Sequence, residues 1–117
     1  MTLRTERVGE GFREILAEEI PKLKDPRVGF VTITGVKVSA DLRHATVYYT
    51  ALGDESARKG TRAGLRSASS HLRTSLGRQV RLKFLPELEF EEDVSVEQGE
   101  RIDRMIERIH REEAGDD

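Results

Sequence analysis

The spacing of apolar residues changes several times along this 117-residue chain, and the order of these changes restricts the possible fold. Apolar residues recur every three or four positions over residues 8–23, which is typical of an amphipathic helix. Residues 30–39 are instead rich in β-branched side chains, and residues 44–50 alternate between two faces, which indicates two strands. Helical spacing returns over residues 56–76, and alternation returns over residues 80–90.

Glycine and proline residues predict where these elements end. Pro21 should end or kink the first helix near Ile20, because proline lacks the N–H that a helix interior needs. The apolar positions shift from odd to even numbers across Gly35, which predicts a β-bulge there. Gly77 should stop the second helical segment, and Pro86 should interrupt the third strand. The short link at residues 40–41 makes the first two strands antiparallel neighbours.

The resulting order of helix, two strands, helix and strand predicts an α+β fold with two layers. Helices should cover one face of the sheet, and the other face should be wet. We expect residues 1–93 to form one domain and residues 94–117 to form a further helix with a disordered tail. The apolar stripe of that last helix consists of Ile102, Met105, Ile106 and Ile109.

Composition excludes several classes of protein. The chain has no cysteine, so a disulfide framework or a cysteine-ligated zinc site is excluded. It has no apolar run of membrane-spanning length, and its first residues lack the apolar core of a signal peptide. We therefore expect a cytoplasmic protein that does not contact membranes.

Charge is distributed very unevenly. The formal net charge is only −2, yet residues 56–86 carry eight basic side chains and no acidic one. Crowded like charges repel each other, and a polyanion such as RNA is the partner that most directly favours such a segment. The basic residues are Arg58, Lys59, Arg62, Arg66, Arg73, Arg78, Arg81 and Lys83.

On a helical wheel, the basic side chains occupy one arc next to the apolar arc. We call Arg58, Lys59, Arg62, Arg66 and Arg73 the basic ridge, and Ser69 lies in the same arc. A solvated helix face normally mixes charge signs at a spacing of four residues, but this segment offers no acid for such pairs. Arg78 follows Gly77, and Arg81 and Lys83 should lie on the outward side of the third strand. This pattern favours phosphate binding over a plain solvated surface.

Signals for catalysis are weak. The carboxylates of residues 87–93 are better explained by alternation along a strand, and no histidine or cysteine joins them. No nucleophile has a base at a recognisable spacing. We expect no enzyme activity, no metal and no cofactor. Two alternatives remain: an adaptor that docks an acidic protein surface on the ridge, and a hydrolase that uses these carboxylates.

Several segments resemble the ribosome-binding factor A family of bacterial small-subunit assembly factors. They are DPRVGF at residues 25–30 with the run that follows to Tyr49, LKFLPEL at residues 82–88 with Phe90 and Asp93, and GERI at residues 99–102. Their order and spacing are more specific than any one of them. The resemblance covers about residues 7–109.

The resemblance implies a KH-like fold of the αββααβ type without the GXXG phosphate clamp, and GXXG is absent from this chain. In that family a helix kink at Ala-x-Gly takes its place, and the matching residues here are Ala68, Ser69 and Ser70. The implied partners are small-subunit (16S) rRNA and the immature 30S subunit, bound late in maturation and most important in the cold. Ser69, Ser70 and the ridge arginines would contact this RNA. We expect a monomer with no small-molecule substrate.

Overall fold

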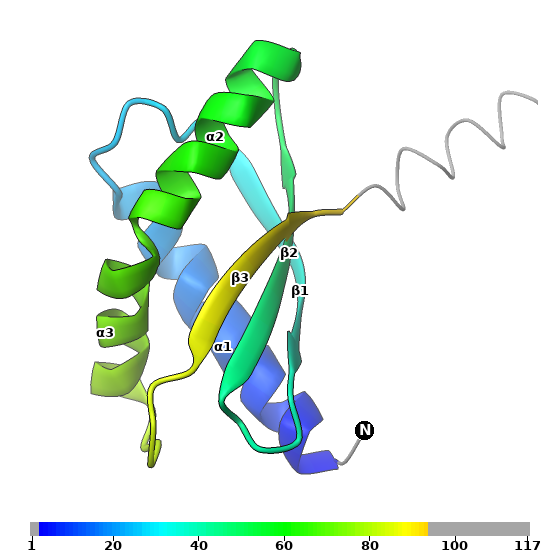
Figure 1. Cartoon of the computed structure of the whole chain (residues 1–117), viewed down its shortest axis with the longest axis vertical. Helices are drawn as coiled ribbons and strands as arrows, with labels where there is room; N and C mark the ends of the chain where they lie inside the picture. Colours follow the sequence, from blue (N-terminus) through cyan, green and yellow to red (C-terminus); the bar gives the residue numbers. More distant parts are fainter. Residues whose placement is uncertain (1–2, 94–117) are drawn as a thin grey trace, which may run out of the picture.

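The structure is a computed structural model that describes residues 3–93. It contains three helices, a short 3-10 turn and three strands in the order αββααβ (Figure 1). The helices are α1 (Leu3–Glu19), α2 (Glu55–Ser67) and α3 (Ser69–Gln79), the turn is Ile20–Lys22, and the strands are β1 (Val31–Val38), β2 (His44–Ala51) and β3 (Glu87–Glu92). The mixed α+β class is therefore confirmed. The further helix expected after residue 93 lies outside the described residues.

The three strands form one sheet in the order β1-β2-β3. β1 and β2 pair antiparallel, whereas β2 and β3 pair parallel, so the chain crosses over through α2 and α3 between them. The register of β1 against β2 shifts between Ile33 and Gly35. This shift confirms the predicted bulge, which lets apolar side chains on both sides of Gly35 face the same layer.

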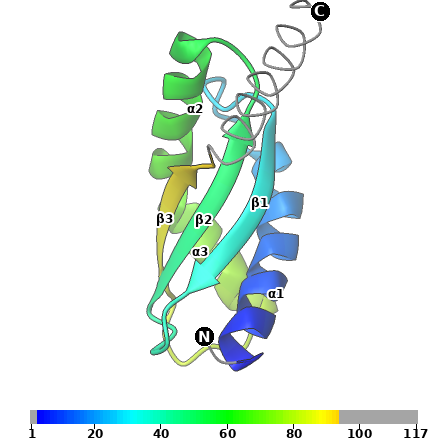
Figure 2. The same cartoon turned by 90° about the vertical axis from the view of Figure 1, so that its right-hand side faces the viewer.

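The helices pack on one face of the sheet and leave the other face open (Figure 2). The buried core contains residues from every layer: Phe12, Leu16, Ile20, Ile33, Val38, Ala45, Val47, Tyr49, Leu65, Leu72 and Leu76. Thr32, Thr34 and Lys37 of β1 are exposed on the opposite side. The expected arrangement of one covered and one wet face is thus confirmed.

Pro21 acts as expected, and Gly77 does not. Pro21 lies in the 3-10 turn that follows α1, so the first helix ends where predicted. Gly77 does not stop the second helical segment, because α3 continues to Gln79. A Cβ atom at Gly77 would lie 2.5 Å from Cδ2 of Leu85. This glycine is therefore explained by the close approach of a neighbouring segment and not by helix termination.

The third strand is shorter than predicted, because residues 80–86 form an irregular segment and β3 begins only at Glu87. Pro86 lacks the N–H that a ladder needs. The guanidinium of Arg73 also donates hydrogen bonds to the carbonyls of Pro86 (2.8 Å) and Leu85 (3.2 Å). A side chain from α3 thus satisfies backbone groups that a strand partner would otherwise take.

No helix within residues 3–93 is both long and apolar enough to cross a membrane.

Candidate nucleic-acid interface

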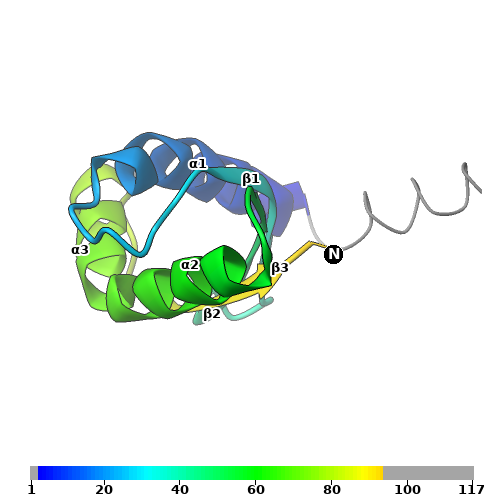
Figure 3. The same cartoon turned by 90° about the horizontal axis from the view of Figure 1, so that it is seen from above.

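The helical segment is interrupted at Ala68, between α2 and α3. Ala68 has φ −85° and ψ −2°, which is at the edge of the helical region. Its N–H donates to the carbonyl of Gly64 (3.0 Å), and its own carbonyl accepts from the N–H of Leu72 (2.9 Å). The axis changes direction at this point, as Figure 3 shows most clearly. The break therefore falls on the first of the three residues that the family pattern indicated.

A groove of about 260 Å³ lies between this break and β3. Arg62, Arg66 and Ser69 line its helical side. Leu88, Glu89 and Phe90 line its strand side. The structure thus brings together three residues that the sequence analysis proposed for RNA binding, and β3 adds two apolar side chains and the Glu89 carboxylate.

Arg58 and Arg62 have an acidic partner in Glu92, at the end of β3. The Nε atom of Arg58 lies 2.6 Å from Oε1 of Glu92, and Nη2 of Arg62 lies 3.5 Å from Oε2. The hydrogen bond from Arg58 is the main cause of a lowered pKa for Glu92, so this carboxylate stays ionised. Residues 56–86 contain no acid, as the sequence shows, but β3 supplies acidic partners from outside that segment, including Glu87 at 3.5 Å from Arg73.

The remaining ridge residues differ in the interactions that their side chains already make. Arg66 is exposed, and its side chain makes no ion pair or hydrogen bond within residues 3–93. Lys59 lies 3.7 Å from Glu55 in an exposed pair, which contributes little. Arg73 is half-buried and is committed to the carbonyls of Leu85 and Pro86. Arg66 is thus the ridge cation most available to a ligand.

The three basic residues after the ridge lie elsewhere. Arg78 is exposed in the last turn of α3. Arg81 and Lys83 belong to the irregular segment, so the expectation that they extend the ridge along a strand is wrong. They line a separate hollow beside the β1–β2 connection, together with Arg43. Pro86 and the backbone contacts of Arg73 are the physical cause of this displacement.

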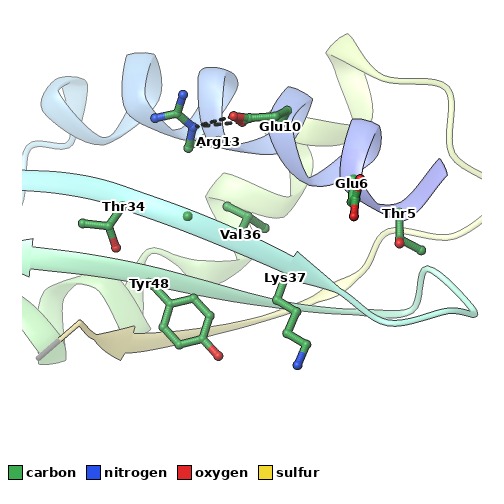
Figure 4. A pocket seen from close by; sticks show the side chains of 9 residues that line it. Thr5, Glu6, Glu10, Arg13, Thr34, Val36, Lys37 and Tyr48 are labelled. Carbon is green, nitrogen blue, oxygen red and sulfur yellow. Dashed lines mark hydrogen bonds and ion pairs between the residues drawn. The ribbon is translucent and has the colours of Figure 1, made fainter. Parts of the chain in front are cut away.

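A hollow beside the N-terminal half of α1 offers a useful contrast (Figure 4). Its volume is about 600 Å³, and β1 and β2 contribute Lys37 and Tyr48 to it. It carries both charge signs, and Glu10 is already paired with Arg13 at 3.1 Å. This mixture does not favour a polyanion. Within residues 3–93, no group of three or more His, Asp or Glu side chains could hold a metal ion.

The loop before β1 forms hydrogen bonds with side chains of α2. Arg27 forms two-atom contacts with Asp25, the shortest being 2.6 Å, and it also donates to Oγ of Ser67 at 3.1 Å. The bonds from Arg27 to Asp25 lower the pKa of Asp25 to about 2. The N–H of Gly29 donates to Oγ1 of Thr61 at 3.3 Å. The DPRVGF segment thus anchors the helix that carries the ridge.

Sequence reasoning missed the role of Glu92, although a signal for it existed. Leu88 and Phe90 face the helices, and the alternation of a strand puts Glu92 on that same face. A carboxylate on the covered face needs a cationic partner. The ridge arginines lie about thirty residues away in sequence, so only the parallel pairing of β3 with β2 revealed which ones it meets.

Comparison with known proteins agrees with this geometry. The family model described as "Ribosome-binding factor A" matches residues 4–106. The chain belongs to this family. Curated ribosome-binding factor A proteins are similar over nearly their whole length: that of Geobacter sulfurreducens is 51% identical over 97% of this chain and 98% of its own, and that of Geobacter metallireducens is 48% identical over 100% of both.

Solved structures of ribosome-binding factor A are similar as well. The crystal structure from Thermus thermophilus has a TM-score of 0.68 and 34% identity, over 75% of this chain and 94% of its own. A homology model of the Thermus thermophilus protein, fitted into the cryo-EM map of a 30S–RbfA complex, has a TM-score of 0.63 and 35% identity, over 74% and 91%. The expected KH-like fold is therefore confirmed for this member of the ribosome-binding factor A family.

Proposed function

We propose that this protein is an assembly factor that binds rRNA of the small ribosomal subunit in the groove between the α2–α3 break and β3. Membership of the ribosome-binding factor A family supports a ribosomal target. A Thermus relative was fitted into the map of a complex with the 30S subunit. By this proposal the protein acts in the cytoplasm as a monomer, and its partner is the immature subunit.

The observation that carries the proposal is the position of Arg66. It is an exposed arginine, unpaired within residues 3–93, at the mouth of a groove that also presents the Ser69 residue of the helix break. A guanidinium can bind a phosphate with two parallel hydrogen bonds. A serine can accept from or donate to a 2′-hydroxyl, which distinguishes RNA from DNA. No catalytic group is needed for such binding.

The Glu92 carboxylate can compete with an RNA phosphate for two of the ridge arginines. It is paired with Arg58 and Arg62 while no RNA is bound, so a phosphate that binds the same guanidinium nitrogens must compete with it. Binding then exchanges one anion for another at these two residues. This exchange favours closely fitting RNA over non-specific polyanions, because only well-placed phosphates can offset the lost ion pairs.

The proposed role is to hold one conformation of the rRNA during late maturation. Wrong pairings in RNA open slowly in the cold, so a protein that stabilises one arrangement should matter most at low temperature. Cells that lack the protein should then grow poorly in the cold and accumulate immature small subunits. Large subunits should mature normally.

Arg66→Ala tests the groove directly. Binding of this variant to a fragment of precursor small-subunit rRNA should weaken, and the slope of log affinity against log salt should become shallower by about 0.9, the value for one phosphate contact. Lys24→Ala is the matched control, since Lys24 is an exposed cation outside the groove. Equal losses for both variants would contradict the proposal. Binding of an acidic protein instead of RNA would favour the adaptor.

A further inference from the structure

A second cationic hollow lies at the other end of the molecule from α2, where the β1–β2 connection meets the segment before β3 (Figures 1 and 2). Its volume is about 330 Å³. Four basic side chains line it: Arg4, Arg43, Arg81 and Lys83. Asp41 is the single acid, so the hollow has a strong excess of positive charge.

The hollow also contains an exposed aromatic ring. Phe84 is 48% exposed, although the chain has only four phenylalanines and Phe12 among them is fully buried. The guanidinium carbon of Arg43 lies 4.4 Å from the centre of the Phe84 ring, and Nζ of Lys83 lies 5.6 Å from it. A ring and a guanidinium in this arrangement offer flat surfaces on which a base can stack.

The floor of this hollow is held by backbone contacts. The N–H of Arg43 donates to Asp41 at 3.0 Å, and its carbonyl accepts from the N–H of Glu87 at 2.7 Å. Leu42 has a φ of +61°, which is uncommon for a residue other than glycine, and its side chain packs against the core. The Asp41 carboxylate also accepts a hydrogen bond from the Ser39 hydroxyl at 2.6 Å, so it is bound within the β1–β2 connection. These contacts fix the backbone that carries Arg43.

Two of the cations are not committed to any protein group. Arg4 and Arg81 are exposed, and neither side chain makes an ion pair or hydrogen bond in the described part of the chain. Free cations beside an exposed ring are a combination that single-stranded nucleic acid uses: the ring stacks a base, and the cations contact the phosphates on either side. An acidic protein surface would need the cations alone and would gain nothing from the exposed ring.

We propose that this hollow binds one unpaired nucleotide of RNA, with its base stacked beside Phe84 and Arg43 and its phosphates on Arg4 and Arg81. The inference rests on the proposed function, because it assigns a second contact to the same RNA partner. The groove beside the helix break contacts one part of the RNA, and the hollow captures an unpaired residue at a distance from it. Such a pair of contacts selects an RNA that presents both elements at the correct separation.

The test uses the full-length protein and two probes: a short unpaired RNA that contains one 2-aminopurine, and an RNA duplex of equal length. Phe84→Leu keeps apolar bulk but removes the ring. It should weaken binding of the unpaired RNA by about 5- to 150-fold, the range for one stacked base, and should abolish the quenching of 2-aminopurine fluorescence. Binding of the duplex should not change. Phe30→Leu, which alters another exposed ring outside the hollow, should leave both affinities unchanged.

Arg81→Ala provides a second variant in case Phe84→Leu fails to fold. It should reduce the salt slope for unpaired RNA by about 0.7, which corresponds to one phosphate contact on a single strand. Unchanged binding and quenching in Phe84→Leu, or a salt slope that Arg81→Ala leaves intact, would overturn the inference. A third contradicting result is that poly-glutamate displaces the unpaired RNA while Phe84→Leu binds that RNA normally. An acidic protein would then be the occupant of the hollow.

These outcomes separate the inference from the proposed function. If Arg66→Ala weakens binding to precursor rRNA while Phe84→Leu changes nothing, the groove stands and the hollow is not a nucleotide site. If the native protein binds neither unpaired nor duplex RNA, both conclusions are wrong.

Discussion

Tyr49 is the largest fully buried side chain of the core, and its hydroxyl has no hydrogen-bond partner within the described residues. A buried polar group without a partner costs about 1–3 kcal/mol. Tyr49→Phe should therefore raise the free energy of unfolding by about 1 kcal/mol or more. Denaturant titration measures this change, with Tyr48→Phe on the open face as the control. A loss of stability in Tyr49→Phe would mean that the hydroxyl is satisfied.

Asp25 shows how one carboxylate can fix a loop. Its pKa falls from an ordinary value of 3.8 to about 2, mainly because the Arg27 side chain donates hydrogen bonds to it. A lowered folded-state pKa contributes stability that is fully present above about pH 4 and is lost as the pH falls through about 2. The difference in Tm between the native protein and Asp25→Asn should be constant above pH 4 and should shrink below it. An NMR titration of Asp25 with a midpoint near 4 would contradict this.

At the scale of elements, the approach of α2 to the loop before β1 depends on Gly64. A Cβ atom at this position would lie 2.5 Å from Cγ2 of Val28, whereas one at Gly60 would lie no closer than 3.5 Å to any group outside the helix. Gly64→Ala should destabilise the protein by about 1–3 kcal/mol through overpacking. Gly60→Ala should stabilise it by up to about 1 kcal/mol, since alanine is the better helix former. Thermal unfolding of both variants tests this, and equal effects would contradict it.

At the same scale, the sequence predicted features that depend on local patterns and failed for those that depend on contacts between separate segments. Local patterns predicted the first helix, both hairpin strands and the bulge at Gly35, because each depends on neighbours in sequence. The predictions were wrong at Gly77 and over residues 80–85, because the Leu85 side chain and the Arg73 guanidinium decide the structure there. In the candidate site, the sequence located Arg62, Arg66 and Ser69 on one helical arc. It could not reveal that Glu92 neutralises part of that arc, or that Arg81 and Lys83 join Arg43 and Phe84.

For the whole molecule, the balance between Glu92 and phosphate should control RNA affinity. Glu92→Gln removes a carboxylate that competes with phosphate for Arg62 and Arg58, so affinity for precursor rRNA should rise on the order of tenfold and its salt slope should steepen. Glu91→Gln removes the same charge from an exposed position of β3 and should have a smaller effect. Binding isotherms at several salt concentrations distinguish the two variants. A larger gain for Glu91→Gln would contradict the competition between carboxylate and phosphate.

The most direct test asks whether rRNA of the small subunit contacts the groove beside the helix break and not the open face of the sheet. Ser69 lies in the groove beside the helix break, whereas Thr32 lies exposed on the open face of the sheet. A photo-crosslinking amino acid should be introduced at either position, the protein bound to immature small subunits, and the crosslinked products mapped. We expect Ser69 variants to crosslink to discrete nucleotides of small-subunit rRNA and Thr32 variants to crosslink weakly or not at all. Crosslinks from Ser69 to ribosomal proteins alone, or equal crosslinking of rRNA from both positions, would contradict the account.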